Sequence, residues 1–212
     1  MSSIKLSRRS LILGAAGMAA VHQSAAQVAR NRFDVDRFVE DIKNARTETD
    51  GRYAVEEILH RTVAQPRAVL ASLGERPAGI YPIHRSDNLT ILNVVWAPLM
   101  VLLPHNHNMW ASIGIYSGRE DNIIWEQDGS QVTATRAASL AEKDVFGLPA
   151  DAIHSVTNPI GRLTGAIHIY GGDFFAPGRS EWDAEGLTER PWDLDAVRGE
   201  FDKAAARFSA VP

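Results

Sequence analysis

The chain of 212 residues contains no cysteine. This absence excludes disulfide bonds, cysteine nucleophiles and thiolate metal ligands, so nitrogen and oxygen atoms must hold any bound metal. The chain also lacks a run of basic residues, and its net charge is −4 at pH 7. An acidic protein without a basic patch is a poor partner for the negatively charged phosphates of nucleic acids. We therefore expect no nucleic-acid partner.

The apolar stretch at residues 11–21 is too short to cross a bilayer, because a transmembrane helix needs about 20 apolar residues. It follows the twin arginine Arg8-Arg9 and precedes small residues at 24–26, where a signal peptidase would cut. Residues 1–26 thus resemble a twin-arginine export signal. We expect a periplasmic or exported protein that uses this machinery and has no stable membrane insertion. The alternative is an ordinary amphipathic or membrane-anchoring N-terminal helix. If the signal is not functional, we expect a cytoplasmic protein.

The rest of the chain divides into three segments. Its 45% hydrophobic residues can bury a substantial core, which predicts one globular domain with appended segments. Residues 27–75 have helical periodicity, and residues 191–212 return to it with Asp193 as a candidate N-cap. Between them, residues 76–190 carry short aliphatic runs separated by turn residues, which is typical of an all-β sandwich or barrel. Strands are expected at residues 89–95, 99–103, 111–116, 122–126, 131–135, 153–157 and 165–170.

Three histidines form the clearest pattern in the chain. His105 and His107 are two residues apart on an extended segment, so their side chains share one face of a strand. His154, on a later strand, can complete a face of three nitrogens around one metal ion. This is the ligand arrangement of a metal-binding β-barrel of the cupin type. The expected fold is therefore an all-β core, a cupin double-stranded β-helix or jelly-roll barrel, with N-terminal helices and a C-terminal helix.

The carboxylate of the common cupin pattern is missing. That pattern has a glutamate four or five positions after the second histidine, where this chain has Ala111 and Ser112. Three neutral imidazoles leave Fe(II) with its full charge and up to three open positions, which favours anionic ligands such as a thiolate or an enolate, together with dioxygen. Sites that keep positions open are catalytic rather than structural.

The metal motifs resemble those of a known family. The stretch from His105 to Glu120, HNHNMWASIGIYSGRE, resembles the first metal motif of bacterial thiol dioxygenases, the group of cysteine dioxygenase and 3-mercaptopropionate dioxygenase. Residues 153–158 and 166–171 are similar to the second and third motifs, and the resemblance covers roughly residues 85–180. It implies Fe(II) held by His105, His107 and His154. It also implies a reaction that adds both atoms of dioxygen to a small thiol carboxylate, giving a sulfinic acid.

The resemblance also implies a polar row beside the iron. In this family a serine, a histidine and a tyrosine alternate along one strand, and the matching residues here are Ala166, His168 and Tyr170. Alternation places all three on one face. The implied catalytic residues are Tyr170, which would hydrogen-bond the bound oxygen or substrate, and His168, which would orient it. Without the serine, His168 lacks the neighbour that fixes its tautomer. The alternative interpretation is that both line the barrel and satisfy each other.

Two arginines are candidates for binding the substrate carboxylate, since a planar guanidinium suits bidentate binding. Arg179 lies eleven residues after His168 and matches the arginine of the bacterial 3-mercaptopropionate dioxygenases; Arg85 resembles that of the cysteine dioxygenases. Either is otherwise a surface residue.

Two other functions stay open: dioxygenolytic cleavage of a diketone or flavonol, and a non-enzymatic exported cupin that binds a ligand or metal.

Overall fold

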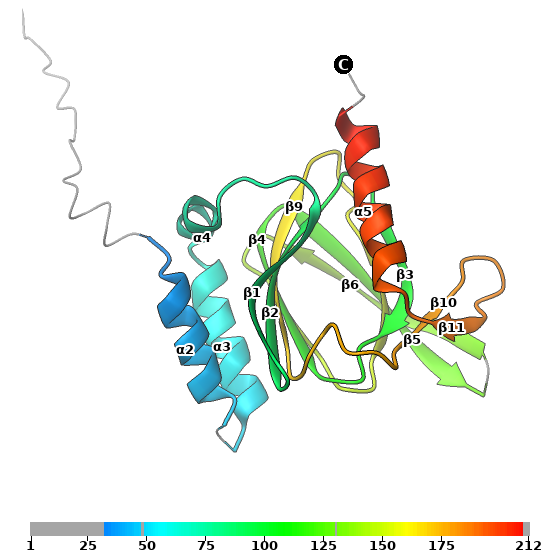
Figure 1. The fold of residues 1–212 in the computed structure, drawn as a ribbon, viewed down its shortest axis with the longest axis horizontal. Coiled ribbons are helices and arrows are strands. Elements are labelled where there is room, and N and C mark those ends of the chain that lie inside the picture. Colours follow the sequence, from blue (N-terminus) through cyan, green and yellow to red (C-terminus); the bar gives the residue numbers. More distant parts are fainter. Residues whose placement is uncertain (1–31, 48, 130, 210–212) are drawn as a thin grey trace, which may run out of the picture. The chain divides into compact units, whose positions relative to one another are not determined.

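The computed structural model describes residues 32–209 except residues 48 and 130, and the expected export signal lies outside these residues. Figure 1 shows a barrel of strands with α2–α4 on one side and α5 on the other. The helices are α2 (Val35–Ala45), α3 (Gly51–Val63), α4 (Pro66–Leu73) and α5 (Leu194–Ser209). The strands are β1 (Gly79–Ser86), β2 (Leu89–Trp96), β3 (Val101–Asn106), β4 (Ala111–Ser117), β5 (Arg119–Asp128), β6 (Gln131–Ala141), β7 (Val145–Leu148), β8 (Ile153–Thr157), β9 (Thr164–Tyr170), β10 (Ser180–Trp182) and β11 (Glu189–Pro191).

The strand order is that of a jelly roll. One sheet has the order β1-β2-β9-β4-β7 and the other β11-β10-β3-β8-β5-β6, with antiparallel pairing throughout. From β2 to β9, each strand is followed by one in the opposite sheet, except at the β5–β6 hairpin. This alternation between two facing sheets makes the double-stranded β-helix. The predicted cupin-type barrel is thereby confirmed.

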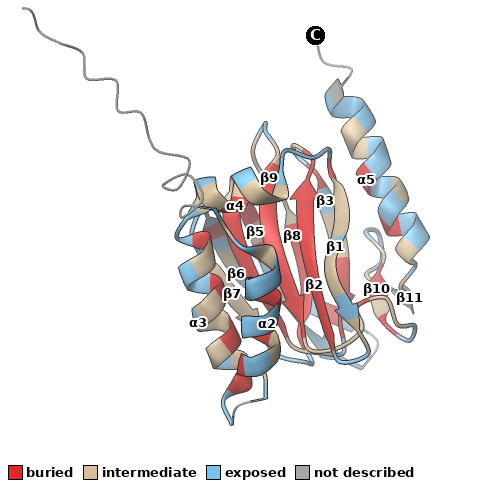
Figure 2. Ribbon diagram, turned by 60° about the vertical axis from the view of Figure 1, so that its left-hand side comes forward, coloured by how far each residue is buried: buried red, intermediate tan, exposed pale blue. Residues whose placement is uncertain are grey.

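Alternation along β9 separates the barrel interior from an outer core. Ala166 and Tyr170 belong to the core inside the barrel, whereas Ile167 and Ile169 pack outside it in a second core with α2, α3 and α4. Figure 2 shows strands that are buried while α2 and α3 are buried on one side only. At Gly114 on β4 a Cβ atom would lie 2.8 Å from Leu59 of α3, so only glycine permits this close packing.

Most expected elements are present, with some differences. The strand expected at residues 99–103 begins only at Val101, because Leu99 has φ of 57°, a left-handed conformation that no strand contains. The expected C-terminal helix is confirmed, and its cap is Asp193, whose Oδ1 accepts from the backbone N–H of Asp195 at 2.9 Å and of Ala196 at 3.1 Å. Among the described residues, no helix is long and apolar enough to cross a membrane.

Candidate metal centre

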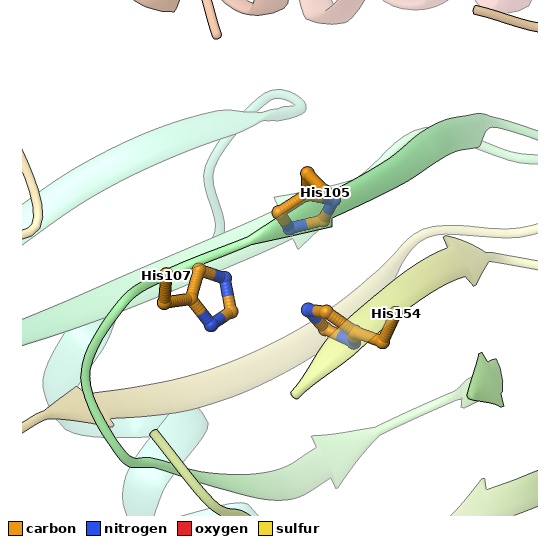
Figure 3. A group of neighbouring side chains, drawn as sticks. All are labelled: His105, His107 and His154. Carbon is orange, nitrogen blue, oxygen red and sulfur yellow. The ribbon is translucent and has the colours of Figure 1, made fainter. Parts of the chain in front are cut away.

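The three predicted histidines meet inside the barrel. His105 on β3 pairs directly with His154 on the neighbouring β8, and His107 follows one residue after the end of β3. All three side chains are buried, and one ligand atom from each lies within 4.8 Å of the others. Figure 3 shows the three rings turned toward a common point from these two segments. Among the described residues, no carboxylate joins this cluster.

Hydrogen bonds leave lone pairs free on two of these rings. Nδ1 of His105 lies 2.8 Å from the carbonyl oxygen of Leu103, and Nδ1 of His154 lies 2.7 Å from Oδ1 of Asn122. Both oxygens can only accept, so each Nδ1 donates and the lone pair is on Nε2. Nε2 of His154 is buried and has no hydrogen-bond partner among the described residues. Because buried polar atoms are almost always satisfied, this atom fits a metal ligand.

Burial keeps the three imidazoles neutral. It lowers the pKa of His105 from 6.5 to about 4. It lowers the pKa of His107 and of His154 well below the ordinary value, and in each case the neighbouring histidines lower it further. The neutral ring is the form that binds a metal, so the ligands need lose no proton near pH 7.

The two residues at the positions of the missing glutamate, Ala111 and Ser112, make other contacts. Ala111 packs in the apolar core inside the barrel. Ser112 faces α3, where its Oγ lies 3.5 Å from Oε1 of Glu56. Neither residue can supply a carboxylate, so the candidate donor set consists of three nitrogens.

His168 and Tyr170 lie beside the cluster on β9. The hydroxyl of Tyr170 is 3.0 Å from Nδ1 of His168, and the Tyr170 ring packs edge-on against the ring of His107 at 4.9 Å between centroids. Burial raises the pKa of Tyr170, which keeps the phenol protonated. The structure therefore brings this predicted pair to the three histidines.

Arg179 is a buried cation that has no salt-bridge partner among the described residues, although the Asp173 carboxylate is near enough to raise its pKa. It is only 5% exposed, and its three guanidinium nitrogens have no hydrogen-bond partner among the described residues. Its Cζ lies 3.5 Å from the centroid of the Trp192 ring and 4.3 Å from that of Phe174, and the Phe174 ring in turn packs on Tyr170 at 4.6 Å. Burial lowers its pKa to about 10, so the group stays charged at neutral pH. A buried cation whose hydrogen-bond donors are free in this way is suited to bind an anion.

Arg85, the other predicted carboxylate ligand, lies elsewhere. Its side chain is about half exposed, and its guanidinium makes two parallel bonds to Asp173, Nε to Oδ1 at 2.9 Å and Nη2 to Oδ2 at 2.8 Å. These bonds occupy the Nε–Nη2 edge of the guanidinium and tie Arg85 to the loop that carries Phe174. The structure thus brings Arg179 close to the histidines but not Arg85.

Glu120 is a feature that the sequence did not reveal. This fully buried carboxylate accepts from Trp96 Nε1 at 2.7 Å and from Asn122 Nδ2 at 3.0 Å, and its Oε2 lies 3.4 Å from Nε2 of His168. Its only signal in the sequence was the spacing of Glu120 and Asn122, two residues apart on one strand face. It connects the candidate ligand His154 with the His168–Tyr170 pair.

The cavity beside the histidines has a volume of about 20 Å³, enough for about one water-sized group. Its wall is mainly apolar. It is formed by Ile80, Leu92, Val94, Trp96, Leu102, His105, His154, Val156, His168, Tyr170, Phe174, Trp192, Val197 and Phe201. The polar side-chain atoms among the lining residues belong to the histidines, Tyr170 and the indole nitrogens of Trp96 and Trp192, so few groups can orient a ligand.

No family model matches this chain. Among solved structures it is similar to an RmlC-like cupin family protein with a double-stranded β-helix fold from Methanocaldococcus jannaschii, at 10% identity and TM-score 0.39 over 47% of this chain and 84% of that one. DMSP lyase DddQ from Ruegeria pomeroyi gives 18% identity and TM-score 0.38 over 48% and 49% of the two chains. Oxalate decarboxylase from Bacillus subtilis gives 15% identity and TM-score 0.37 over 60% of this chain and 31% of that one. Because all three scores are below 0.5, the fold assignment rests on the strand order.

Proposed function

We propose that this protein is a non-haem Fe(II) dioxygenase that oxidises a small thiol carboxylate, such as 3-mercaptopropionate or a cysteine-like thiol, to its sulfinic acid. The observation that carries the proposal is the buried guanidinium of Arg179, which has no hydrogen-bond partner among the described residues and is near enough to the three-histidine cluster to lower the pKa of His105 and His107. A site with this charge takes an anion at Arg179 and a second anionic group at the metal. A thiol carboxylate supplies both groups in one small molecule.

The proposed reaction is balanced by its two reactants. R–SH and O2 give R–SO2H, in which sulfur loses four electrons, dioxygen gains four, and both oxygen atoms end on sulfur. When bound, Fe(II) supplies a position where a thiol becomes more acidic and lies beside dioxygen.

The chain's own residues position the substrate. Arg179 holds the carboxylate, and its stacking between Trp192 and Phe174 fixes the plane of the guanidinium. The hydroxyl oxygen of Tyr170 accepts a hydrogen bond from the substrate, and His168, 3.0 Å from this hydroxyl, fixes its direction. The apolar wall excludes bulk water, which strengthens these polar contacts.

The size of the cavity favours a small thiol over a flavonol. A space of about 20 Å³ accepts a small group near the metal, and a three-carbon acid requires some movement of the wall. A flavonol, with three rings, would require displacement of much of the wall. A small diketone and a non-enzymatic ligand-binding protein remain as alternative outcomes of the test.

The test is the substitution Arg179→Ala, assayed by oxygen consumption with 3-mercaptopropionate and with propanethiol, the matching thiol without a carboxylate. Charge-assisted hydrogen bonds contribute roughly 1.5–3 kcal/mol, so kcat/KM for the acid should fall by about one to two orders of magnitude, mostly through KM. The value for propanethiol should change much less.

Two control variants accompany this test at equal iron occupancy. Arg67→Ala removes an exposed positive charge on α4 and should leave both substrates unaffected. Arg85→Ala removes the partner of Asp173 and should have a smaller effect than Arg179→Ala. If kcat/KM of Arg179→Ala for both thiols equals that of the wild type, Arg179 does not hold the carboxylate. Oxygen uptake by the wild type with a diketone alone would select the other enzyme, and metal binding without uptake would select the binding protein.

A further inference from the structure

Glu120 is a buried carboxylate to which the proposed reaction assigns no task. It lies at the inner face of β5, and its two oxygens accept from different donors, Oε2 from Trp96 Nε1 at 2.7 Å and Oε1 from Asn122 Nδ2 at 3.0 Å. The indole nitrogen of Trp96 can only donate. Glu120 is therefore held as an acceptor on one side, and its other oxygen faces the amide of Asn122.

This contact determines how Asn122 is oriented. Because a carboxylate oxygen accepts, Asn122 must turn its NH2 group toward Glu120 and its carbonyl oxygen toward His154, 2.7 Å from Nδ1. His154 Nδ1 must then carry the proton. The lone pair of His154 is thus on Nε2, the buried atom that has no other partner among the described residues. The tautomer of a candidate metal ligand is set two hydrogen bonds away by Glu120.

The same carboxylate acts on His168 from the opposite sheet. Oε2 of Glu120 lies 3.4 Å from Nε2 of His168, a distance at which a lone pair on Nε2 would be repelled and an N–H attracted, although the pair lacks hydrogen-bond geometry. The proton of His168 is therefore on Nε2, and Nδ1 accepts from the hydroxyl of Tyr170 at 3.0 Å. Position 166, from which a serine could act on this ring, holds alanine.

We propose that Glu120 is a positioning residue that sets the tautomers of both His154 and His168. Through Asn122 it directs the Nε2 lone pair of His154 to the metal, and by its own charge it directs the Tyr170 hydroxyl to His168. The inference rests on the proposed metal centre for its first effect only. The second effect concerns the metal-free chain.

The substitution Glu120→Gln tests this chain of hydrogen bonds. If the NH2 group of the new glutamine faced Trp96 Nε1, two donors would meet at 2.7 Å. If it faces Asn122 instead, the Asn122 side chain must turn its oxygen toward the new glutamine and its NH2 group toward His154. Nδ1 of His154 must then accept, so its proton moves to Nε2. We expect the second arrangement in the metal-free variant. Binding of Fe(II), measured anaerobically by competition with a chelator, should weaken by about 10- to 100-fold, as for other groups that orient metal ligands.

A second substitution separates this role from a merely structural one. Adding Trp96→Phe to Glu120→Gln removes the opposing indole N–H, so the amide can present its oxygen to Asn122 again. Fe(II) affinity should recover in the double variant, whereas two independent structural defects would add. Glu126→Gln, an exposed change on the same strand, is the matched control and should bind Fe(II) as the wild type does.

Nitrogen-15 NMR of the histidine rings in the metal-free protein reads the tautomers directly. The expected protonated atoms are Nδ1 of His154 and Nε2 of His168 in the wild type, and Nε2 of both in Glu120→Gln. In the double variant we expect Nδ1 of both, because the new NH2 group then faces Nε2 of His168. A wild type with the His168 proton on Nδ1 would overturn the proposal without any variant. So would Glu120→Gln with unchanged His154 protonation and Fe(II) affinity. A wild type that binds no Fe(II) would refute the metal centre while leaving the NMR test of Glu120 in place.

Discussion

Burial has different consequences for the histidines and for Arg179. It removes the charge from three imidazoles, whose pKa values fall below the physiological range, but it leaves Arg179 charged because a pKa of about 10 is still well above 7. The site without metal therefore combines the positive charge of Arg179, three neutral donors and the buried carboxylate of Glu120. A divalent metal would add to that positive charge, which makes an anionic ligand the natural occupant.

At the residue scale, we predict that His105→Ala, His107→Ala and His154→Ala each remove most of the bound iron and all activity while the fold persists. Three donors on a rigid barrel offer little redundancy. Metal content and thermal unfolding of each variant measure the two effects. His60→Ala, an exposed histidine on α3, is the control. Full iron and full turnover in any of the three variants would show that the ligand set is wrong.

The same histidines predict how stability depends on pH. The pKa of His105 is 6.5 in the unfolded chain and about 4 in the folded chain. Between these values the unfolded chain binds more protons, so the free energy of unfolding of the metal-free protein falls as the pH falls. Over this window the loss from His105 alone is on the order of 3 kcal/mol. Urea unfolding at several pH values measures it. An unchanged slope in His105→Ala would contradict this explanation.

At the scale of elements, α5 closes one wall of the cavity. Phe201 stacks on Trp96 with ring centroids 5.1 Å apart, and Val197 lines the same cavity. We predict that Phe201→Ala destabilises the protein by roughly 3–5 kcal/mol, because it leaves a void against Trp96. Phe208→Ala, on an exposed part of the same helix, should change stability by only about 0.5 kcal/mol. Equal urea midpoints for the two variants would show that α5 is not part of the barrel core.

The sequence predicts the elements whose signal is local. Aliphatic runs between turn residues indicate the strands around the jelly roll, and Asp193 indicates the start of α5. β1 was not predicted because Pro82 and partly exposed residues weaken its pattern, and β7, β10 and β11 are only three or four residues long. Pairing with neighbouring strands makes these segments strands, and that pairing is not contained in a short stretch of sequence.

The site was predictable to a similar degree. The spacing of the three histidines and the alternation on β9 indicated which side chains meet. Glu120 could not be predicted, because it lies in a polar run between Arg119 and Asp121 and glutamates are rarely buried. Only the pairing of β5 with β8, which places Ile124 opposite His154, shows that Glu120 faces inward.

At the scale of the whole molecule, one sheet is covered on both faces. Its inner face contributes to the barrel core with the candidate site, and its outer face packs on α2, α3 and α4. The three candidate metal ligands come from two separate segments of the chain, β3 with the residue that follows it and β8, and the pairing of these strands brings them together. Export in the folded state would allow the metal to be bound in the cytoplasm first, which suits the twin-arginine route.

We predict that changing Arg8 and Arg9 together to lysine leaves the protein in the cytoplasm with its signal uncleaved. Cell fractionation and the mass of the purified chain measure this outcome. The control is Arg32→Lys, which lies beyond the expected cleavage region and should not alter export. Normal periplasmic accumulation of the double variant would count against this route.

The central claim is tested most directly with 18O-labelled dioxygen. Wild-type protein loaded with Fe(II) is mixed with 3-mercaptopropionate, and oxygen uptake is measured together with the mass of the product. The account predicts one O2 consumed per thiol and a sulfinic acid that carries two labelled oxygen atoms, with neither result in His154→Ala. Iron-loaded protein that consumes no oxygen with any small thiol, or a product with one labelled atom or none, would contradict it.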